Sequence, residues 1–234
     1  MNQDRRDRLR DAAVAVLGGA GGRGLTHRAV DAAADVPPGT AKNYFPSRDA
    51  LLRAVAERCL EQYLAVASTL AGSGAGSGSA SASASASASA SASASGSGAE
   101  ARSGAEAGAG GVPEPSARPG PAAFLAGLLR DVAGPGRTRM LAYLELQGEA
   151  ARRPWLAALI DPIGAGDFAA HRHLLEAAGL PAGSDGARTL TLALHGAVPH
   201  LLAGAPATLA AAGLDDLDAF ARRLLNTVCP EETP

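Results

Sequence analysis

Polar and basic side chains gather between residues 26 and 48, in types that form hydrogen bonds with nucleic acid. Arginine can pair with guanine, and asparagine with adenine, through two hydrogen bonds, whereas threonine, tyrosine and lysine suit phosphate oxygens. The candidate DNA contacts are Thr26, His27, Arg28, Pro38, Gly39, Thr40, Lys42, Asn43, Tyr44 and Arg48. Alone, such residues more often solvate the surface of a small domain, so the elements that carry them decide the interpretation.

The segment 24–52 predicts a short helix, a turn, a second short helix, a turn and a long helix. Thr26 can cap the first of these helices, and Val36 closes the turn against the core. Pro38 is expected to open the second helix, which runs through Tyr44 for about two turns, since the first residue of a helix tolerates proline. This is the layout of a helix-turn-helix DNA-binding unit.

Two longer helices are expected around this unit. One carries apolar residues at helical spacing between Leu9 and Leu17, and the glycines at 18–22 are expected to end it. The other begins after Ser47, a good N-cap, and repeats apolar residues every three or four positions from Leu51 to Leu70. A stiff helix of this length would connect the DNA-binding unit to the rest of the chain.

The same segment resembles the TetR family of bacterial repressors. The matching residues are Thr26, Val30, Ala34, Val36, Gly39, Thr40, Tyr44, Phe45, Ser47, Arg48 and Leu51. Two residues depart from the family pattern, because Asp35 replaces the usual turn glycine and Lys42 replaces a tyrosine. Aspartate tolerates positive φ better than most residues, so the turn is expected to survive. The lysine would keep affinity for DNA but could change the sequence that is read.

The resemblance implies a homodimeric repressor that binds a double-stranded, palindromic DNA operator and leaves it when an unknown small-molecule effector binds. Two DNA-binding units would then lie in successive major grooves, about 34–36 Å apart. The last two helices, rich in leucine between Leu190 and Leu225, would form a dimeric four-helix seam. The alternative is a helical small-molecule binding protein, or an unrecognised enzyme, that keeps this scaffold without binding an operator; Asp35, an acid near the DNA-facing turn, gives that alternative some weight.

Composition agrees with two domains and with a local DNA contact. The 234 residues have a formal net charge of −2, but the charge is unevenly distributed. Residues 1–65 carry ten basic and eight acidic side chains, and the other 169 residues carry 11 and 15. The positive charge therefore lies on the expected DNA-binding part, which favours docking at one place over coating long nucleic acid.

The two cysteines, Cys59 and Cys229, are far apart and have no metal-ligand spacing, as expected for a reduced cytoplasmic protein. The chain has no signal-peptide pattern and no run of about eighteen apolar residues, so neither export nor membrane insertion is expected. Residues 72–119, with an alternating Ser-Ala tract, have almost no apolar bulk and are expected to be a disordered insertion.

The remaining chain predicts an all-α fold, with apolar stripes at helical spacing and no β-branched runs. We expect a helix-turn-helix domain at 1–50, a connecting helix at 51–71, the insertion at 72–119, and a ligand-binding and dimerisation domain at 120–230. A helix starting at Pro154 is expected to break near 162–166. Polar groups among apolar neighbours can orient a ligand. The pocket candidates are Tyr143, Gln147, Trp155, Phe168, His171, His195 and His200.

Other patterns are set aside. The glycines from Gly19 to Gly24 formally match a dinucleotide-binding fingerprint, but a helix rather than a strand precedes them. The spacing of the histidines does not favour metal ligation, and no nucleophile or acid–base pair supports an enzyme. The charged residues between Arg137 and Arg153 are interpreted as ordinary surface ion pairs. No cofactor and no metal are therefore expected.

Overall fold

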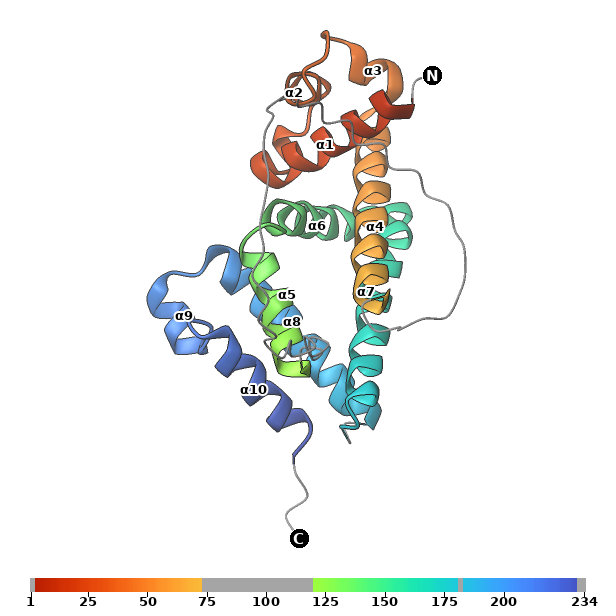
Figure 1. Ribbon diagram of the computed structural model, residues 1–234. Coiled ribbons are helices and arrows are strands. Elements are labelled where there is room, and N and C mark those ends of the chain that lie inside the picture. Colours follow the sequence, from red (N-terminus) through yellow and green to blue (C-terminus); the bar gives the residue numbers. More distant parts are fainter. Residues whose placement is uncertain (1–2, 73–119, 181–182, 231–234) are drawn as a thin grey trace, which may run out of the picture.

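The computed structural model describes residues 3–72, 120–180 and 183–230, and in this part of the chain the secondary structure consists of helices joined by short turns, with no strand. The disorder expected at 72–119 falls, apart from Gly72 at the end of a helix, outside this part. Figure 1 shows the arrangement of the helices. Their bounds are α1 Gln3–Gly24, α2 His27–Ala33, α3 Thr40–Tyr44, α4 Arg48–Gly72, α5 Pro121–Ala133, α6 Arg137–Ala150, α7 Pro154–Ala177, α8 Gly183–Ala203, α9 Pro206–Ala212 and α10 Leu217–Val228.

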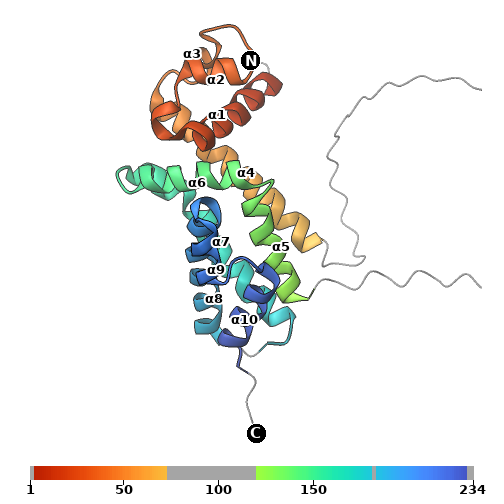
Figure 2. The same cartoon turned by 90° about the vertical axis from the view of Figure 1, so that its left-hand side faces the viewer.

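Two hydrophobic cores organise these helices. The first core joins α1–α4 to α6 and the first half of α7, and it includes Leu9, Leu52, Leu146 and Leu156, each fully buried. The second core joins α5, α8, α10 and the end of α7. Figure 2 shows α1–α3 at one end of the molecule and α8–α10 toward the other, with α6 directly beneath α1. The α1–α3 unit therefore shares one continuous core with the body.

The close approach of α1 to α6 depends on Gly18. A Cβ built at this position would lie 3.0 Å from the carbonyl carbon of Thr138, on the facing backbone of α6. The expectation that the glycines end the first helix is confirmed at Gly21, whose backbone is not helical, although a further helical segment continues α1 to Gly24. The helix kinks at Gly21, where φ is 67°. Gly18 thus serves packing between helices, and Gly21 provides the change of direction.

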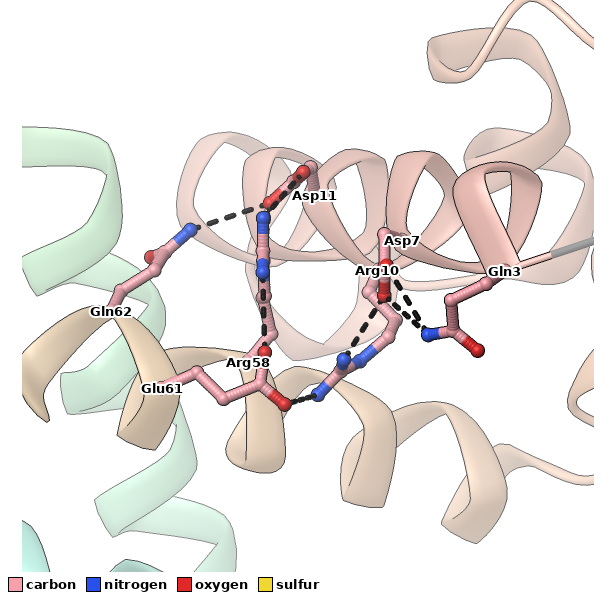
Figure 3. A network of polar contacts seen from close by, with 7 residues as sticks. All are labelled: Gln3, Asp7, Arg10, Asp11, Arg58, Glu61 and Gln62. Carbon is pink, nitrogen blue, oxygen red and sulfur yellow. Dashed lines mark hydrogen bonds and ion pairs between the residues drawn. The ribbon is translucent and has the colours of Figure 1, made fainter. Parts of the chain in front are cut away.

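A polar network also fixes α1 against α4 (Figure 3). Arg10, which is buried, donates to Glu61 at 2.6 Å and to Asp7 at 3.2 Å, and Arg58 donates to Asp11 at 2.7 and 2.9 Å. Burial opposes ionisation of Glu61, but hydrogen bonds from Arg10 and Arg58 outweigh it and hold the pKa of Glu61 below its usual value. The network holds two helices of the first core in a fixed orientation.

Two expectations about the body need correction. The predicted break near 162–166 is absent, since α7 runs for 24 residues with Pro162 inside it. Packing of α7 against α4, α6 and α8 outweighs the hydrogen bond that proline removes. The short α9 was not anticipated. Within the described residues no helix is long and apolar enough to cross a membrane.

Candidate functional site

The helices on either side of α3, α2 and α4, begin at the caps that the sequence predicts. The Thr26 hydroxyl accepts from the Ala29 amide at 3.1 Å, and the Ser47 hydroxyl accepts from the Ala50 amide at 3.1 Å, so both predicted N-caps are confirmed. Asp35 adopts φ 50°, the left-handed conformation that its place in the turn requires. The α2–turn–α3 unit lies at the opposite end of the molecule from α10 (Figure 1).

The start of α3 differs from the prediction. The helix begins at Thr40 rather than at Pro38 and is five residues long. Gly39 is its N-cap and has φ 90°, a left-handed conformation that excludes it from the helix and leaves Pro37 and Pro38 in the turn. The exposed surface of α3 is correspondingly small.

The predicted DNA contacts divide by exposure. Lys42 and Asn43 on α3 and Arg28 on α2 are exposed, as are Thr26, Pro38 and Gly39 in the flanking turns. Tyr44 is half-buried and packs against the first core. Thr40 is half-buried too, and its hydroxyl donates to the Pro37 carbonyl at 2.6 Å. The structure therefore leaves Arg28, Lys42 and Asn43 as the long polar side chains most available to a partner.

Two of the predicted contacts instead bind the backbone of this chain. His27 Nε2 lies 2.6 Å from the Phe45 carbonyl oxygen. The Arg48 guanidinium donates to the carbonyl oxygens of Gly22 at 2.6 Å and Leu25 at 3.0 Å. Both side chains hold the unit together, which the sequence did not indicate.

Sequence reasoning missed Asp31. This carboxylate is 3% exposed and accepts from the amides of Gly39 at 2.7 Å and Ala41 at 2.6 Å. The available signal was an acid inside an apolar helix, shortly before two prolines that have no amide hydrogen to donate.

A groove of about 550 Å³ lies between α6 and α7. Three of the predicted pocket residues line it, namely Tyr143, Gln147 and Phe168, and Asp161 is the one charged side chain of the lining. The remaining lining is small or aliphatic. Burial and the carboxylate of Asp167 raise the pKa of the Tyr143 phenol, so the phenol stays protonated and can donate a hydrogen bond.

The other four predicted pocket residues lie elsewhere. Trp155 packs against the first core, with the Arg53 guanidinium 4.7 Å from its ring centre. His195 pairs with Asp167 at 3.0 Å, and its ring meets Phe168 edge-on. His200 is exposed on α8. His171 is buried, with Nδ1 3.0 Å from the Thr191 hydroxyl.

His171 gives a prediction about pH. The Thr191 hydroxyl donates to the Ala187 carbonyl, so His171 Nδ1–H must donate to Thr191. Burial lowers the pKa of His171 below its usual value of about 6.5, so the folded state prefers neutral imidazole. Stability should fall as the pH drops below about 6.5, because the unfolded chain then takes up the proton more readily than the folded state. Urea unfolding should show less of this loss in His171→Leu, whereas His173→Leu, altered at an exposed histidine, should resemble the wild type.

The charged residues of α6 join the body to the N-terminal unit. Glu145 accepts from the Gly22 amide at 2.9 Å, and Glu149 pairs with Arg48 at 3.8 Å and with Arg153. Arg153 also reaches Asp49, at the start of α4. These contacts correct the interpretation of ordinary surface pairs. We call Glu145, Glu149, Arg48 and Arg153 the α6 tether.

Known proteins resemble the chain over both parts. Residues 118–228 match the family model described as tetracyclin repressor-like, C-terminal domain. The multidrug binding protein EbrR, solved with imidazole, is 25% identical, with a TM-score of 0.55 over 100% of this chain and 94% of that one. The same protein solved with ethidium is 26% identical, with a TM-score of 0.54 over 97% and 99%.

A member of the TetR family from Streptomyces coelicolor A3 is 24% identical, with a TM-score of 0.58 over 97% of this chain and 99% of that one, and it supports the fold alone. The comparison with curated proteins finds no match. An N-terminal helix-turn-helix unit, a family match over the C-terminal domain and relatives of the same fold over nearly the whole chain lead to one conclusion. The chain has the fold of TetR-family transcriptional regulators and carries a C-terminal domain of their type at 118–228.

Proposed function

We propose that the chain is a cytoplasmic repressor that binds a palindromic DNA operator as a homodimer and releases it when a small molecule occupies the α6–α7 groove. The observation that carries the proposal is the exposure of Lys42 and Asn43 on a short helix at the tip of the molecule, between the capped helices α2 and α4 of a helix-turn-helix unit. Asparagine can read adenine, and lysine can bind guanine or phosphate.

The dimer would form through α8 and α10, but fewer of their apolar side chains are free to contact a second copy than the sequence suggested. Leu190, Leu194 and Leu225 are buried in the second core, and Phe220 and Leu224 pack against it. Leu192 of α8 remains 61% exposed, more than any other large apolar side chain whose exposure the structure describes. We propose that a second copy covers this residue and its neighbours on α8.

The effector would be an aromatic cation. Phe168 and Tyr143 offer ring surfaces, and Asp161 supplies the one formal charge of the groove lining. A cation between these groups would gain both ring contacts and charge pairing. That EbrR has been solved with ethidium, a planar aromatic cation, supports this choice of effector class.

Helix α6 would carry the signal from the groove to the DNA. Its last turns contribute Gln147 and Ala150 to the groove, while Glu145 and Glu149 on the same turns belong to the α6 tether. An effector that shifts α6 would therefore shift the backbone near Gly22 and the start of α4. Affinity for DNA would fall by the ratio of the effector's affinities for the two states.

The test is selection of binding sequences from a pool of randomised DNA duplexes by the full-length protein. A palindromic consensus, bound in anisotropy titrations by two chains per duplex and weakened by added ethidium, would support the proposal. Recovery of no sequence preference at any salt concentration would refute operator binding. An unchanged affinity with ethidium bound would refute the effector assignment alone.

Lys42→Ala and Asn43→Ala should each weaken binding to the selected duplex, by roughly 1–3 kcal/mol for a base contact. A phosphate contact by Lys42 would instead reduce the salt dependence of binding by about one counterion. Anisotropy titrations across several salt concentrations distinguish these roles. Thr208→Ala, at an exposed position of α9, provides a control that should leave affinity unchanged.

A further inference from the structure

We infer that α2 holds both ends of α3 by hydrogen bonds, through Asp31 and His27, and that these two side chains set the orientation of α3, the helix that would enter DNA. Neither residue would touch a base; both are positioning residues. The inference rests on the proposed DNA-binding function, and it adds the residues that determine how selectively this function is performed.

The hydrogen bonds at the start of α3 use both oxygens of one carboxylate. One Asp31 oxygen accepts from the Gly39 amide at 2.7 Å and the other from the Ala41 amide at 2.6 Å. The side chain is 3% exposed, so water does not compete for these hydrogen bonds. Hydrogen bonds to a charged acceptor are stronger than those between neutral groups.

The hydrogen bond at the end of α3 comes from an imidazole. His27, the first residue of α2, places Nε2 2.6 Å from the carbonyl oxygen of Phe45, the residue that caps the C-terminus of α3. The Phe45 side chain is 2% exposed and forms part of the first core. Because His27 and Asp31 are four residues apart on α2, they lie on the same face of that helix and reach both ends of α3.

This helix needs external support. With five residues, α3 is far shorter than the length at which an isolated helix is stable in water. Its N-cap, Gly39, has no side chain with which to accept from the first turn. The Asp31 carboxylate supplies that missing acceptor, so the direction of α3 follows the direction of α2.

The test compares affinity for the selected duplex with affinity for a random duplex at the same salt concentration. Asp31→Ala removes both acceptors, Asp31→Asn keeps one carbonyl oxygen, and Asp4→Ala makes the same charge change at an exposed site in α1. The expected loss of selectivity is about tenfold or more for Asp31→Ala, smaller for Asp31→Asn and absent for Asp4→Ala. His27→Ala should also lose selectivity, and His27→Gln, which keeps a donor, should recover part of it.

A merely structural role predicts a different result. If Asp31 only stabilised the fold, affinity for both duplexes would fall together with the folded fraction measured by circular dichroism, and that outcome would overturn the inference. Amide exchange in the free protein gives a second measurement: Gly39 and Ala41 should both lose protection in Asp31→Ala while the core of α4 keeps it. If the wild type selects no duplex, the proposed function fails, and unchanged exchange at Gly39 and Ala41 in Asp31→Ala would separately refute the role of Asp31 at the start of α3.

Discussion

Replacing Gly18 with alanine should destabilise the protein by roughly 1–3 kcal/mol, although alanine is the better helix former. The added methyl group would lie 3.0 Å from the carbonyl carbon of Thr138. The contact is with the backbone of α6 rather than with a flexible side chain, so α1 and α6 must move apart and loosen the first core. Chemical denaturation monitored by circular dichroism measures the loss.

The neighbouring glycine provides a matched control. A Cβ added at Gly19 meets nothing within 4 Å, so Gly19→Ala should stabilise α1 by about 0.5–1 kcal/mol through helix propensity alone. Equal effects of the two substitutions would show that the close approach of α1 to α6 does not limit packing at Gly18. A destabilised Gly18→Ala protein beside a stabilised Gly19→Ala protein would confirm the close approach.

Arg48→Ala should cost about 1–3 kcal/mol of stability, because the guanidinium makes two charge-assisted hydrogen bonds to backbone carbonyls of Gly22 and Leu25. The side chain is 42% exposed, which places the expected loss toward the lower end of that range. It should also weaken the ethidium response in the proposed mechanism, since Arg48 joins Glu149 to the start of α4. Urea unfolding and anisotropy titrations with and without ethidium measure the two effects.

The comparison with Lys42→Ala separates a tether from a phosphate contact. Removal of a phosphate contact lowers the salt dependence of DNA binding and leaves stability nearly unchanged. Arg48→Ala should instead lower stability and leave the salt dependence of DNA binding nearly unchanged. A reduced salt slope at unchanged stability would return Arg48 to the DNA-contacting role that the sequence suggested.

The parts of the site that could be predicted from sequence depend on local chemistry. Thr26 and Ser47 cap helices through amides three residues ahead, and Asp35 occupies a turn whose backbone conformation few residues tolerate. Each needs only its own neighbours in the chain. The helical class of the body follows in the same way from the spacing of apolar residues.

The parts that could not be predicted depend on contacts between distant segments. Glu145 bonds the Gly22 amide across 123 positions of the chain, and the packing role of Gly18 exists only because Thr138 faces it. Similarly, α7 continues through Pro162 because neighbouring helices pack along it. Local propensity favours a break there, and tertiary packing outweighs it.

The continuous first core limits how this protein can be recombined with its relatives. Leu146 and Leu156, from α6 and α7, complete the same packed interior as Leu9 and Leu52. A chimaera joined after α4 would pair these faces with foreign counterparts, so the grafted sensor and the retained DNA-binding unit would have to be chosen for complementary shape. A crossover placed beyond Ile163 would leave that interior intact and exchange the end of α7 with α8, α9 and α10, so that α5 would be the one helix of the second core kept from the original chain.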